Sequence, residues 1–230
     1  MTKITVILPA LNEEKGIGKT IDSINKEFFK KNNWDLEIIV VDGNSKDKTR
    51  KIAREKNAKV IIEKRKGYGR AYKTGLSCAT GDIIVTGDAD ATYPFEKIHL
   101  YIKQLLDENL DFITTDRFAG LKHNSMSLKH YFGNFVLNLT LKILFLINIK
   151  DSQSGMWIFK KQALGLIQPI EEFNDGMAFS EEIKIGMFTN KKLKCKEIPS
   201  ELYAREGQVK LQSFTDGWKN FKFLFIKRVK

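Results

Sequence analysis

The sequence predicts an α/β fold whose first half binds a nucleotide, and three observations lead to that class. Short runs of β-branched apolar residues alternate with helical stretches through the first half of the 230 residues, as expected for strands covered by helices on both faces. Polar residues follow three of these runs directly, and ligands in open α/β sheets bind beyond the carboxyl ends of strands. The length suits one domain or two closely packed halves, and we favour a single domain over 1–230.

The elements of the first half follow one another in a regular order. The sequence predicts strands over 4–8, 36–41 and 59–62, a helix that ends near residue 30 after the first strand, and a helix over 48–57 after the second. This alternation is typical of βαβ units, whose crossovers are right-handed.

A glycine-rich turn at 66–70, Lys-Gly-Tyr-Gly-Arg, opens a further predicted helix through residue 77. The turn is too short to match the dinucleotide-binding loop or the phosphate-binding loop, and neither loop occurs in the chain. Its glycines are explained equally well by close approach of the backbone to a ligand and by a simple change of direction. Lys66, at the start of this turn, is a candidate ligand contact.

The stretch Gly81–Pro94 predicts a buried strand that ends in a metal site. Its β-branched run over 83–86 suits a strand covered on both faces, and Asp88 and Asp90 follow that run. Two carboxylates held this close repel each other unless a cation lies between them or one takes up a proton. A divalent ion such as Mg²⁺ or Mn²⁺ would resolve the repulsion while sharing its ligand shell with water and substrate phosphates. Because Asp-x-Asp pairs also occur in loops and helix caps, the prediction depends on the position after the strand.

Polar side chains also follow the first two predicted strands, at the same edge of the sheet as Asp88 and Asp90. Asn12 and Glu13 follow the first strand, and Asp42 ends the second. A carboxylate just beyond a strand can accept hydrogen bonds from a ribose or a base edge. The alternative for Asp42 is structural, since together with Ser45 it would shape the turn and cap the next helix.

Charge and cysteine content narrow the range of partners. With 39 Lys and Arg against 28 Asp and Glu, the formal net charge is +11, which favours nucleic acid, an acidic membrane face or phosphorylated small molecules as partners. The alternative is that the Lys-rich helices serve solubility alone. Cys78 and Cys195 lie far apart without CxxC spacing, which indicates a reducing compartment and no structural zinc. No signal peptide is expected at the N-terminus.

Two apolar segments of the second half are candidates for contact with a membrane. The sequence contains no uninterrupted apolar run of the roughly 20 residues that a membrane span needs. The segment 135–149, within a possible interfacial helix over 127–149, predicts a helix that lies either in the membrane interface or against the sheet. The aromatic and basic segment 218–230 predicts a final helix with the same two alternatives.

Several motifs resemble those of inverting family 2 glycosyltransferases, in the same order and across essentially the whole chain. They are PALNEE, VVDGNSKDKT, KGYGRAYKTGLSCATGD, GDADATYP, the arginine of TTDRF, DSQSG and YAREGQVKL. Within that family the chain most resembles the polyprenyl-phosphate glycosyltransferases, the group of dolichol-phosphate mannose synthase. The resemblance implies one GT-A domain, in which a Rossmann-like nucleotide-sugar half (1–115) and an acceptor half (116–230) share a mixed central sheet flanked by helices.

The resemblance also implies roles for individual residues. Those expected around the nucleotide sugar, besides Lys66, are Pro9, Asn12, Glu13, Asp42, Asp88, Gln153, Glu182 with Glu181 as the alternative register, Arg205 and Lys210. Gln153 and its neighbour Ser154 are expected to face either the sugar or the acceptor. Asp88 and Asp90 are the expected metal ligands. Arg117, with Lys129 or His130, is expected to bind the acceptor phosphate, and with the two aspartates it makes up the expected catalytic set. Structural alternatives are an ion pair for Arg117, a surface position for His130 and a solvated helix face for the two glutamates.

Three positions depart from the family pattern. His130 stands where the family often has an arginine, Thr92 where an extra Gln ligand to the metal is common, and Val209 where the closing loop usually has a serine. The geometry around the lipid headgroup, one metal ligand and one hydroxyl contact to the donor are therefore expected to differ.

The chemistry follows from the charges of the groups involved. Displacing a nucleoside diphosphate from a sugar builds negative charge on the leaving group, which a divalent metal, Arg205 and Lys210 would stabilise. A phosphate monoester, with a second pKa near 6, is already largely dianionic at neutral pH, so it needs positioning more than a general base. An arginine such as Arg117 matches phosphate oxygens geometrically.

These considerations predict a metal-dependent transferase that moves mannose from GDP-mannose, or glucose from UDP-glucose, to a polyprenyl phosphate. We expect it at the cytoplasmic face of a membrane, bound peripherally or anchored by another segment or a partner. The alternatives are a transferase that extends a saccharide, which the lack of a Gln-x-x-Arg-Trp motif disfavours, and a sensor that binds nucleotide sugar without turnover. A nucleic-acid-binding module is also disfavoured, because the polar residues gather at strand ends rather than on one basic, aromatic face.

Overall fold

A seven-stranded mixed sheet runs through the computed structural model, which describes residues 2–120, 128–207 and 213–229. In spatial order its strands are β3 (Lys59–Ile62), β2 (Asp35–Asp42), β1 (Lys3–Ala10), β4 (Ile83–Thr86), β6 (Trp157–Lys160), β5 (Phe112–Gly120) and β7 (Cys195–Glu201). Neighbouring strands pair in parallel except that β6 is antiparallel to both β4 and β5. Residue 115, where the two halves are expected to meet, lies inside β5, so both halves contribute to one sheet.

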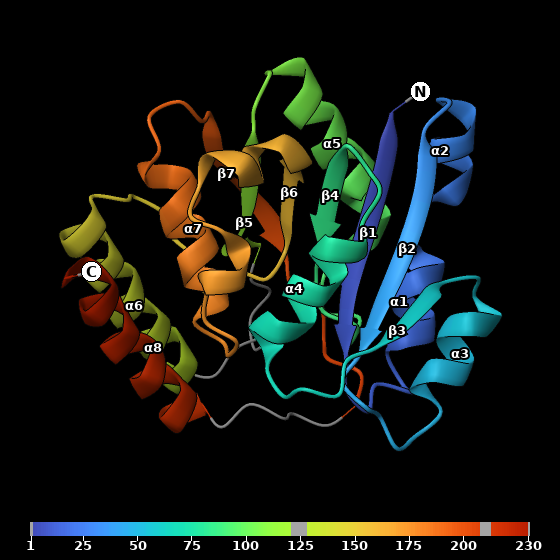
Figure 1. The fold of residues 1–230 in the computed structure, drawn as a ribbon, viewed down its shortest axis with the longest axis horizontal. Coiled ribbons are helices and arrows are strands. Elements are labelled where there is room, and N and C mark those ends of the chain that lie inside the picture. The colour runs from blue at the N-terminus through green and yellow to red at the C-terminus, as the bar shows by residue number, and fades with distance from the viewer. Residues whose placement is uncertain (1, 121–127, 208–212, 230) are drawn as a thin grey trace.

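Helices cover both faces of this sheet (Figure 1). Their bounds are α1 Ile17–Ser23, α2 Lys26–Lys31, α3 Thr49–Glu55, α4 Tyr68–Cys78, α5 Ile98–Asp107, α6 Leu128–Phe145, α7 Phe179–Thr189 and α8 Ser213–Val229, with short 3-10 turns at Phe95–Lys97, Lys161–Leu166 and Ile170–Glu172. Side chains of α4 and α7 pack on one face, and those of α1, α2, α3 and α5 pack on the other. Helices α6 and α8 lie side by side on the outer side of α7 (Figure 1).

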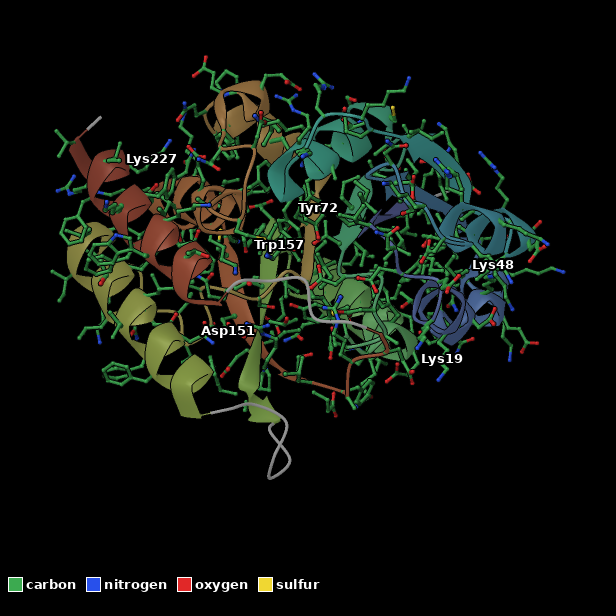
Figure 2. The ribbon with its side chains drawn as sticks, turned by 90° about the horizontal axis from the view of Figure 1, so that it is seen from below. Lys19, Lys48, Tyr72, Asp151, Trp157 and Lys227 are labelled. Atoms are coloured by element: carbon green, nitrogen blue, oxygen red, sulfur yellow. The ribbon has the colours of Figure 1, made fainter. Side chains whose placement is uncertain are left out.

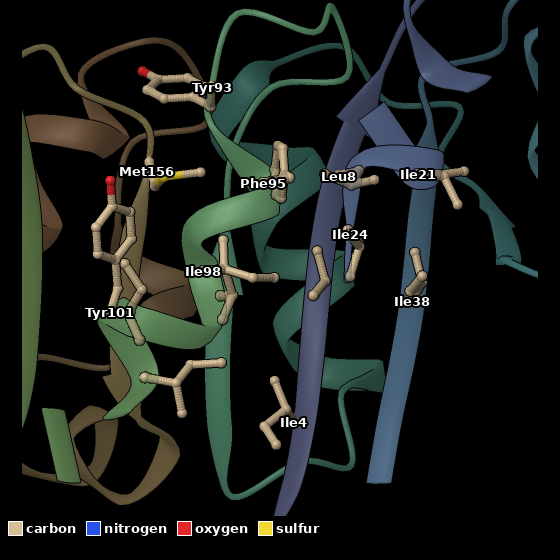
Figure 3. Close-up of a cluster of buried hydrophobic side chains, with 14 of the residues drawn as sticks. Ile4, Leu8, Ile21, Ile24, Ile38, Tyr93, Phe95, Ile98, Tyr101 and Met156 are labelled. Atoms are coloured by element: carbon tan, nitrogen blue, oxygen red, sulfur yellow. The ribbon is translucent and has the colours of Figure 1, made fainter. Parts of the chain in front are cut away.

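The alternation of side chains along the central strands produces the two cores. Ile4, Val6 and Leu8 of β1 point into the core that contains α5, whereas Ile7 points into the core that contains α4. Figure 3 shows the first of these cores, where Leu8 of β1 lies among side chains from the helices. Because every second residue faces each core, both faces of the strand must be apolar, which explains its β-branched run.

Two predicted helix boundaries were wrong for local reasons. The helix expected to run to residue 30 is split into α1 and α2, because Ile24 is extended and the Asn25 side chain accepts the N–H of Phe28 at 3.1 Å as a new helix cap. The helix expected over 127–149, which contains the segment 135–149, begins at Leu128 close to its expected start but ends early at Phe145, since Leu146 has a positive φ of 59°. A left-handed residue of this kind ends a helix.

Candidate active site

The loops that follow β1, β2 and β4 meet at one edge of the sheet, the lower edge in Figure 1. Ala10 at the end of β1 pairs with Asp42 at the end of β2, and β4 runs parallel to β1. Figure 2 views the molecule from this edge, with Tyr72, Trp157 and Asp151 near its centre. The candidate residues of the nucleotide half are therefore brought together by the strand order, as in other sheets whose parallel strands end beside a ligand site.

Hydrogen bonds tie the first two loops together. The N–H of Asn12 donates to Ser45 Oγ at 2.8 Å, and the Asn12 side-chain oxygen accepts the N–H of Lys46 at 2.8 Å. The N–H of Glu13 donates to Thr49 Oγ1 at 2.8 Å. Asn12 has a φ of 51°, a conformation that asparagine tolerates better than most residues. These contacts fix the loop that carries Glu13.

The contacts of Asp42 match its structural role, in which it shapes the turn after β2 together with Ser45. Its side chain is fully buried, and Oδ2 accepts the N–H of Ser45 at 3.0 Å and lies 3.5 Å from a guanidinium nitrogen of Arg50. It therefore shapes the turn after β2, and a contact with a nucleoside stays a prediction. Pro9 lies in β1 opposite Val41, and Lys66 is exposed just before α4.

Arg205 bridges two carboxylates at the centre of the edge. Its guanidinium lies 2.6 Å from Asp90 Oδ2 through one nitrogen and 2.6 Å from Glu13 Oε1 through another. Asp90 and Glu13 are both buried, so the arginine supplies the positive charge that their burial requires. The other oxygen of Asp90 accepts the N–H of Thr92 at 3.1 Å and its hydroxyl at 2.6 Å.

Backbone contacts hold the segment around Arg205 against the loop that follows β4. The N–H of Tyr203 donates to the carbonyl of Thr92 at 2.9 Å, and the N–H of Glu206 donates to the carbonyl of Asp90 at 3.0 Å. Lys19 of α1 adds an ion pair with Glu206 at 2.6 Å. The expected closing loop thus begins in contact with the candidate metal ligand.

Asp88 lies near Asp90 in a half-buried position. Burial, and then the charge of Asp90, raise the pKa of Asp88 to about 7, while the hydroxyl of Tyr68 and the charges of Arg117 and Arg205 act in the opposite direction. Tyr68 donates its hydroxyl to Asp88 Oδ1 at 3.1 Å.

A divalent cation fits the charges of this pair. The raised pKa of Asp88 and the nearness of a second carboxylate describe a donor set whose repulsion a hard cation would relieve. Among the described residues no group of three His, Cys, Asp or Glu side chains gathers as a ready metal site. Such an ion would therefore take further ligands from substrate phosphates or water.

A buried ion pair links Arg117 of β5 to Asp151. Arg117 Nε lies 2.6 Å from Asp151 Oδ2 and its Nη2 lies 2.9 Å from Oδ1, and the N–H of Arg117 also donates to Oδ2 at 3.1 Å. Burial alone would lower the pKa of Arg117, but Asp151 raises it well above its usual value. Burial would raise the pKa of Asp151, but Arg117 holds it below its usual range. The guanidinium therefore stays charged and fixed in orientation.

A fully buried lysine organises the turn that carries Asp151. Lys184 of α7 donates to the carbonyl oxygens of Ser152 and Ser154 at 2.6 Å each, and lies 3.4 Å from that of Asp151. Burial lowers the pKa of Lys184 to about 7. The ammonium gathers three carbonyl oxygens, so it holds the turn much as a small cation would.

The two adjacent glutamates of α7 have different surroundings. Gln153 donates to Glu181 at 2.6 Å and accepts from Asn220 of α8 at 3.0 Å. Glu182 instead accepts the N–H of Asn174 at 2.6 Å and pairs with Lys227 at 2.7 Å, near the far end of α8 (Figure 2). The geometry brings Glu181, rather than Glu182, together with Gln153.

Replacing Glu181 with glutamine is expected to change how stability depends on pH. Burial raises the pKa of Glu181 from 4.5 to about 7, so the folded protein keeps a proton that the unfolded chain releases between these values. Its contribution to stability is thus complete below about 4.5 and is lost as the pH rises through 7. Urea unfolding measures the free energy of unfolding of both proteins. Between about pH 5 and pH 7.5, that of Glu181→Gln should rise by roughly 1–3 kcal/mol relative to that of wild type.

The exposed Glu55 provides the control. Glu55→Gln should follow the wild-type dependence on pH. If the free energies of unfolding of wild type and Glu181→Gln changed with pH in the same way, the assigned environment of Glu181 would be contradicted.

Some expected contacts cannot be placed. Lys210 and Val209 lie outside the described residues, and Lys129 and His130 belong to α6 but their side chains are outside the described part as well. The contacts expected of these residues therefore stay predictions.

Three residues of the site escaped the sequence reasoning. Asp151 is part of the DSQSG motif, in which the family resemblance points only to Gln153 and Ser154. Tyr68 lies within the glycine-rich turn, and its aromatic side chain gave no indication of a carboxylate partner. Lys184 follows Glu181 by one helical turn, a spacing that would have suggested a pair but not its burial.

Known proteins share the sequence pattern and the fold of this chain. A family model described as "Glycosyl transferase family 2" matches residues 5–167. The chain is 33% identical over 228 residues to the low-salt glycan biosynthesis hexosyltransferase Agl6 of Haloferax volcanii, covering 97% of this chain and 53% of that protein. It is 27% identical to the dolichyl-phosphate hexose transferase of the same organism, covering 93% of this chain and 89% of that one. The chain thus spans about half the length of the first relative and most of the second.

Solved structures share the fold. Glucosyl-3-phosphoglycerate synthase from Mycobacterium tuberculosis, in complex with Mn²⁺, UDP and glucosyl-3-phosphoglycerate, superposes with a TM-score of 0.75 at 21% identity, covering 99% of this chain and 80% of that one. At that identity the likeness establishes the GT-A arrangement of the mixed sheet and its helices.

Proposed function

Because the chain belongs to glycosyl transferase family 2 and is a glycosyltransferase, we propose that it transfers a hexose from a nucleotide sugar to the phosphate of a polyprenyl lipid. Relatives named as dolichyl-phosphate transferases support this acceptor class. The observation that carries the proposal is the Arg117 guanidinium, which Asp151 fixes in place and whose positive charge acts to lower the pKa of Asp88. A cation held beside the candidate donor site is suited to a dianionic acceptor.

On the donor side, Asp88 and Asp90 would hold a divalent cation. When bound, that ion would neutralise negative charge on the departing diphosphate. Arg205 pairs with Asp90 and Glu13, and its guanidinium would also stabilise the charge of a diphosphate bound beside them. Excluding water from this cluster strengthens each of these interactions.

On the acceptor side, the residues position the nucleophile rather than deprotonate it. A phosphate monoester with a second pKa near 6 carries most of its negative charge at neutral pH. Arg117 would orient the phosphate oxygens toward the anomeric carbon, with the buried turn at 151–154 keeping the guanidinium in one orientation. Attack from the face opposite the diphosphate would invert the anomeric centre.

A transfer assay tests the proposal. GDP-mannose and UDP-glucose, each radiolabelled in the sugar, are incubated with a short-chain polyprenyl phosphate and Mg²⁺ or Mn²⁺, and label is counted in the lipid extract. Label from one donor, abolished by chelation of the metal, supports the proposal and names the sugar. Metal-dependent binding of a donor without glycolipid formation would instead favour a saccharide acceptor or a sensor.

The outer surface of α6 and α8 supports a lipid-bound acceptor. On α6 the exposed apolar side chains recur at the spacing of one helical face, and the neighbouring helix α8 carries further ones: Phe132, Phe135, Leu139 and Ile143 on α6, with Trp218, Phe225 and Ile226 on α8. Basic residues accompany them, and the Lys222 ammonium lies 5.3 Å from the Trp218 ring centre. This combination of apolar and basic groups is typical of a helix that rests on an anionic membrane surface. None of the described helices combines the length and the apolar character needed to cross a membrane.

Replacing Phe135 and Ile143 together with aspartate is expected to reduce binding to anionic vesicles by at least about tenfold. Each of these apolar side chains contributes on the order of 1–2 kcal/mol when it leaves water, and the added carboxylates are repelled by anionic lipid. Vesicle co-sedimentation measures the change. Leu100→Asp is the control, because Leu100 is similarly exposed on α5, away from this surface. Equal vesicle binding by the double variant and wild type would remove the membrane contact from the proposal.

A further inference from the structure

The glycines of the turn at 66–70 lie against the backbone of the loop 174–176. A Cβ atom on Gly67 would lie 2.1 Å from the carbonyl oxygen of Asp175, and Gly67 has a φ of 136°. A Cβ atom on Gly69 would lie 2.2 Å from the carbonyl oxygen of Asn174. Both contacts are with backbone, which cannot move aside as a side chain can. The turn therefore requires glycine at two positions so that the loop 174–176 can lie against it.

Further bonds fix the first turn of α4 to that loop. The N–H of Gly69 donates to the carbonyl of Gly176 at 3.2 Å, and the N–H of Arg70 donates to that of Asp175 at 3.1 Å. Arg70 and the buried Lys73 each lie 2.8 Å from Asp175 Oδ1. This arrangement leaves Tyr68, between the two glycines, little freedom of position.

Tyr68 reaches the candidate donor site from this anchored turn. Its hydroxyl donates to Asp88 Oδ1 at 3.1 Å and lies 3.3 Å from the hydroxyl of Tyr72. On the other side, a Cβ atom on Gly155 would lie 2.5 Å from the Tyr68 hydroxyl and 3.6 Å from Asp88 Oδ1. The hydroxyl thus fits between Asp88 and a residue that has no side chain.

We propose that Tyr68 is a positioning residue, which holds the Asp88 carboxylate in the orientation that the donor complex requires. This proposal rests on the proposed function, in which Asp88 contacts the metal or the donor diphosphate. With Oδ1 engaged by the hydroxyl, the other oxygen is directed away from Tyr68. Without the hydroxyl, the carboxylate can rotate and loses its preorganised geometry.

Tyr68→Phe is the primary test, because it removes the hydroxyl and keeps the ring. We expect kcat/KM for the nucleotide sugar to fall about tenfold to a hundredfold, the range for losing a hydrogen bond to a charged group. KM for the lipid acceptor and the melting temperature should change little. Tyr101→Phe is the matched control, since this buried tyrosine lies on α5 in the opposite core. A second variant, Gly155→Ala, should displace the hydroxyl and reproduce the loss.

A double-mutant cycle distinguishes positioning of Asp88 from a purely structural role. Mn²⁺-dependent binding of GDP and UDP is measured by calorimetry for wild type, Tyr68→Phe, Asp88→Asn and the double variant. If Tyr68 acts through Asp88, the effect of Tyr68→Phe disappears in the Asp88→Asn background. An equal loss in both backgrounds, or wild-type kcat/KM in Tyr68→Phe, would overturn the proposal. A wild-type protein that binds nucleotide and metal in this cycle but transfers no sugar would overturn the proposed function alone.

Discussion

Asp90→Asn is expected to lower kcat/KM for sugar transfer by about a thousandfold or more. A bound metal contributes several kcal/mol of charge stabilisation to such a reaction, and each ~1.4 kcal/mol corresponds to a factor of ten. The substitution removes a negative charge from the candidate metal site and half of the bridge that Arg205 makes between Asp90 and Glu13. Initial rates with the preferred donor, at several Mn²⁺ concentrations, measure the effect.

Asp107→Asn serves as the control for this variant, because Asp107 is exposed at the end of α5. It should keep the wild-type rate. Melting temperatures of both variants show whether a loss of rate reflects unfolding. Asp90→Asn activity within about threefold of wild type, less than 1 kcal/mol in the barrier, would contradict the assignment of Asp90.

Arg117→Ala is expected to affect both stability and transfer. The substitution leaves the Asp151 carboxylate buried without its partner, which costs about 3–5 kcal/mol of the free energy of unfolding. It also removes the cation that we propose for the acceptor phosphate, so kcat/KM for the lipid should fall at least about a hundredfold, as for the loss of a charge-assisted bond. Urea unfolding and transfer assays measure the two effects separately.

The double variant Arg117→Met, Asp151→Leu separates the two roles of Arg117. Replacing a buried ion pair by apolar residues of similar size is often close to neutral for stability, so the double variant should recover most of the lost stability. Transfer should stay as low as in Arg117→Ala. Recovery of transfer together with stability would mean that Arg117 is only a structural ion-pair partner.

The sequence predicted best those features that depend on local patterns. The run at 83–86 forms β4, and the strand predicted at 59–62 is β3, because β-branched residues bounded by turns identify a buried strand. The antiparallel strand β6 and the edge strand β7 were not located individually, since their pairing depends on residues far away in the chain. The break between α1 and α2 was missed because it depends on a single cap at Asn25.

The site was harder to predict than the fold, for two physical reasons. Adjacent helical residues point about 100° apart, as 3.6 residues per turn requires, so the choice between Glu181 and Glu182 depends on a one-residue register. Burial of Lys184 is also invisible in a sequence, because charged residues are rarely buried without partners, and its partners here are backbone carbonyl oxygens. Asp151 was overlooked for a related reason, since only the folded chain brings it to Arg117.

The most direct test of the central claim compares two lipid acceptors that differ only in the phosphate. Labelled donor, Mn²⁺ and the protein are incubated either with a polyprenyl phosphate or with the polyprenol of the same chain length, and label in the lipid extract is counted. The account predicts glycolipid from the phosphate alone, with the loss of that product in Arg117→Ala. Transfer to the free alcohol at a comparable rate would contradict it, because the acceptor would then be a hydroxyl that needs a general base.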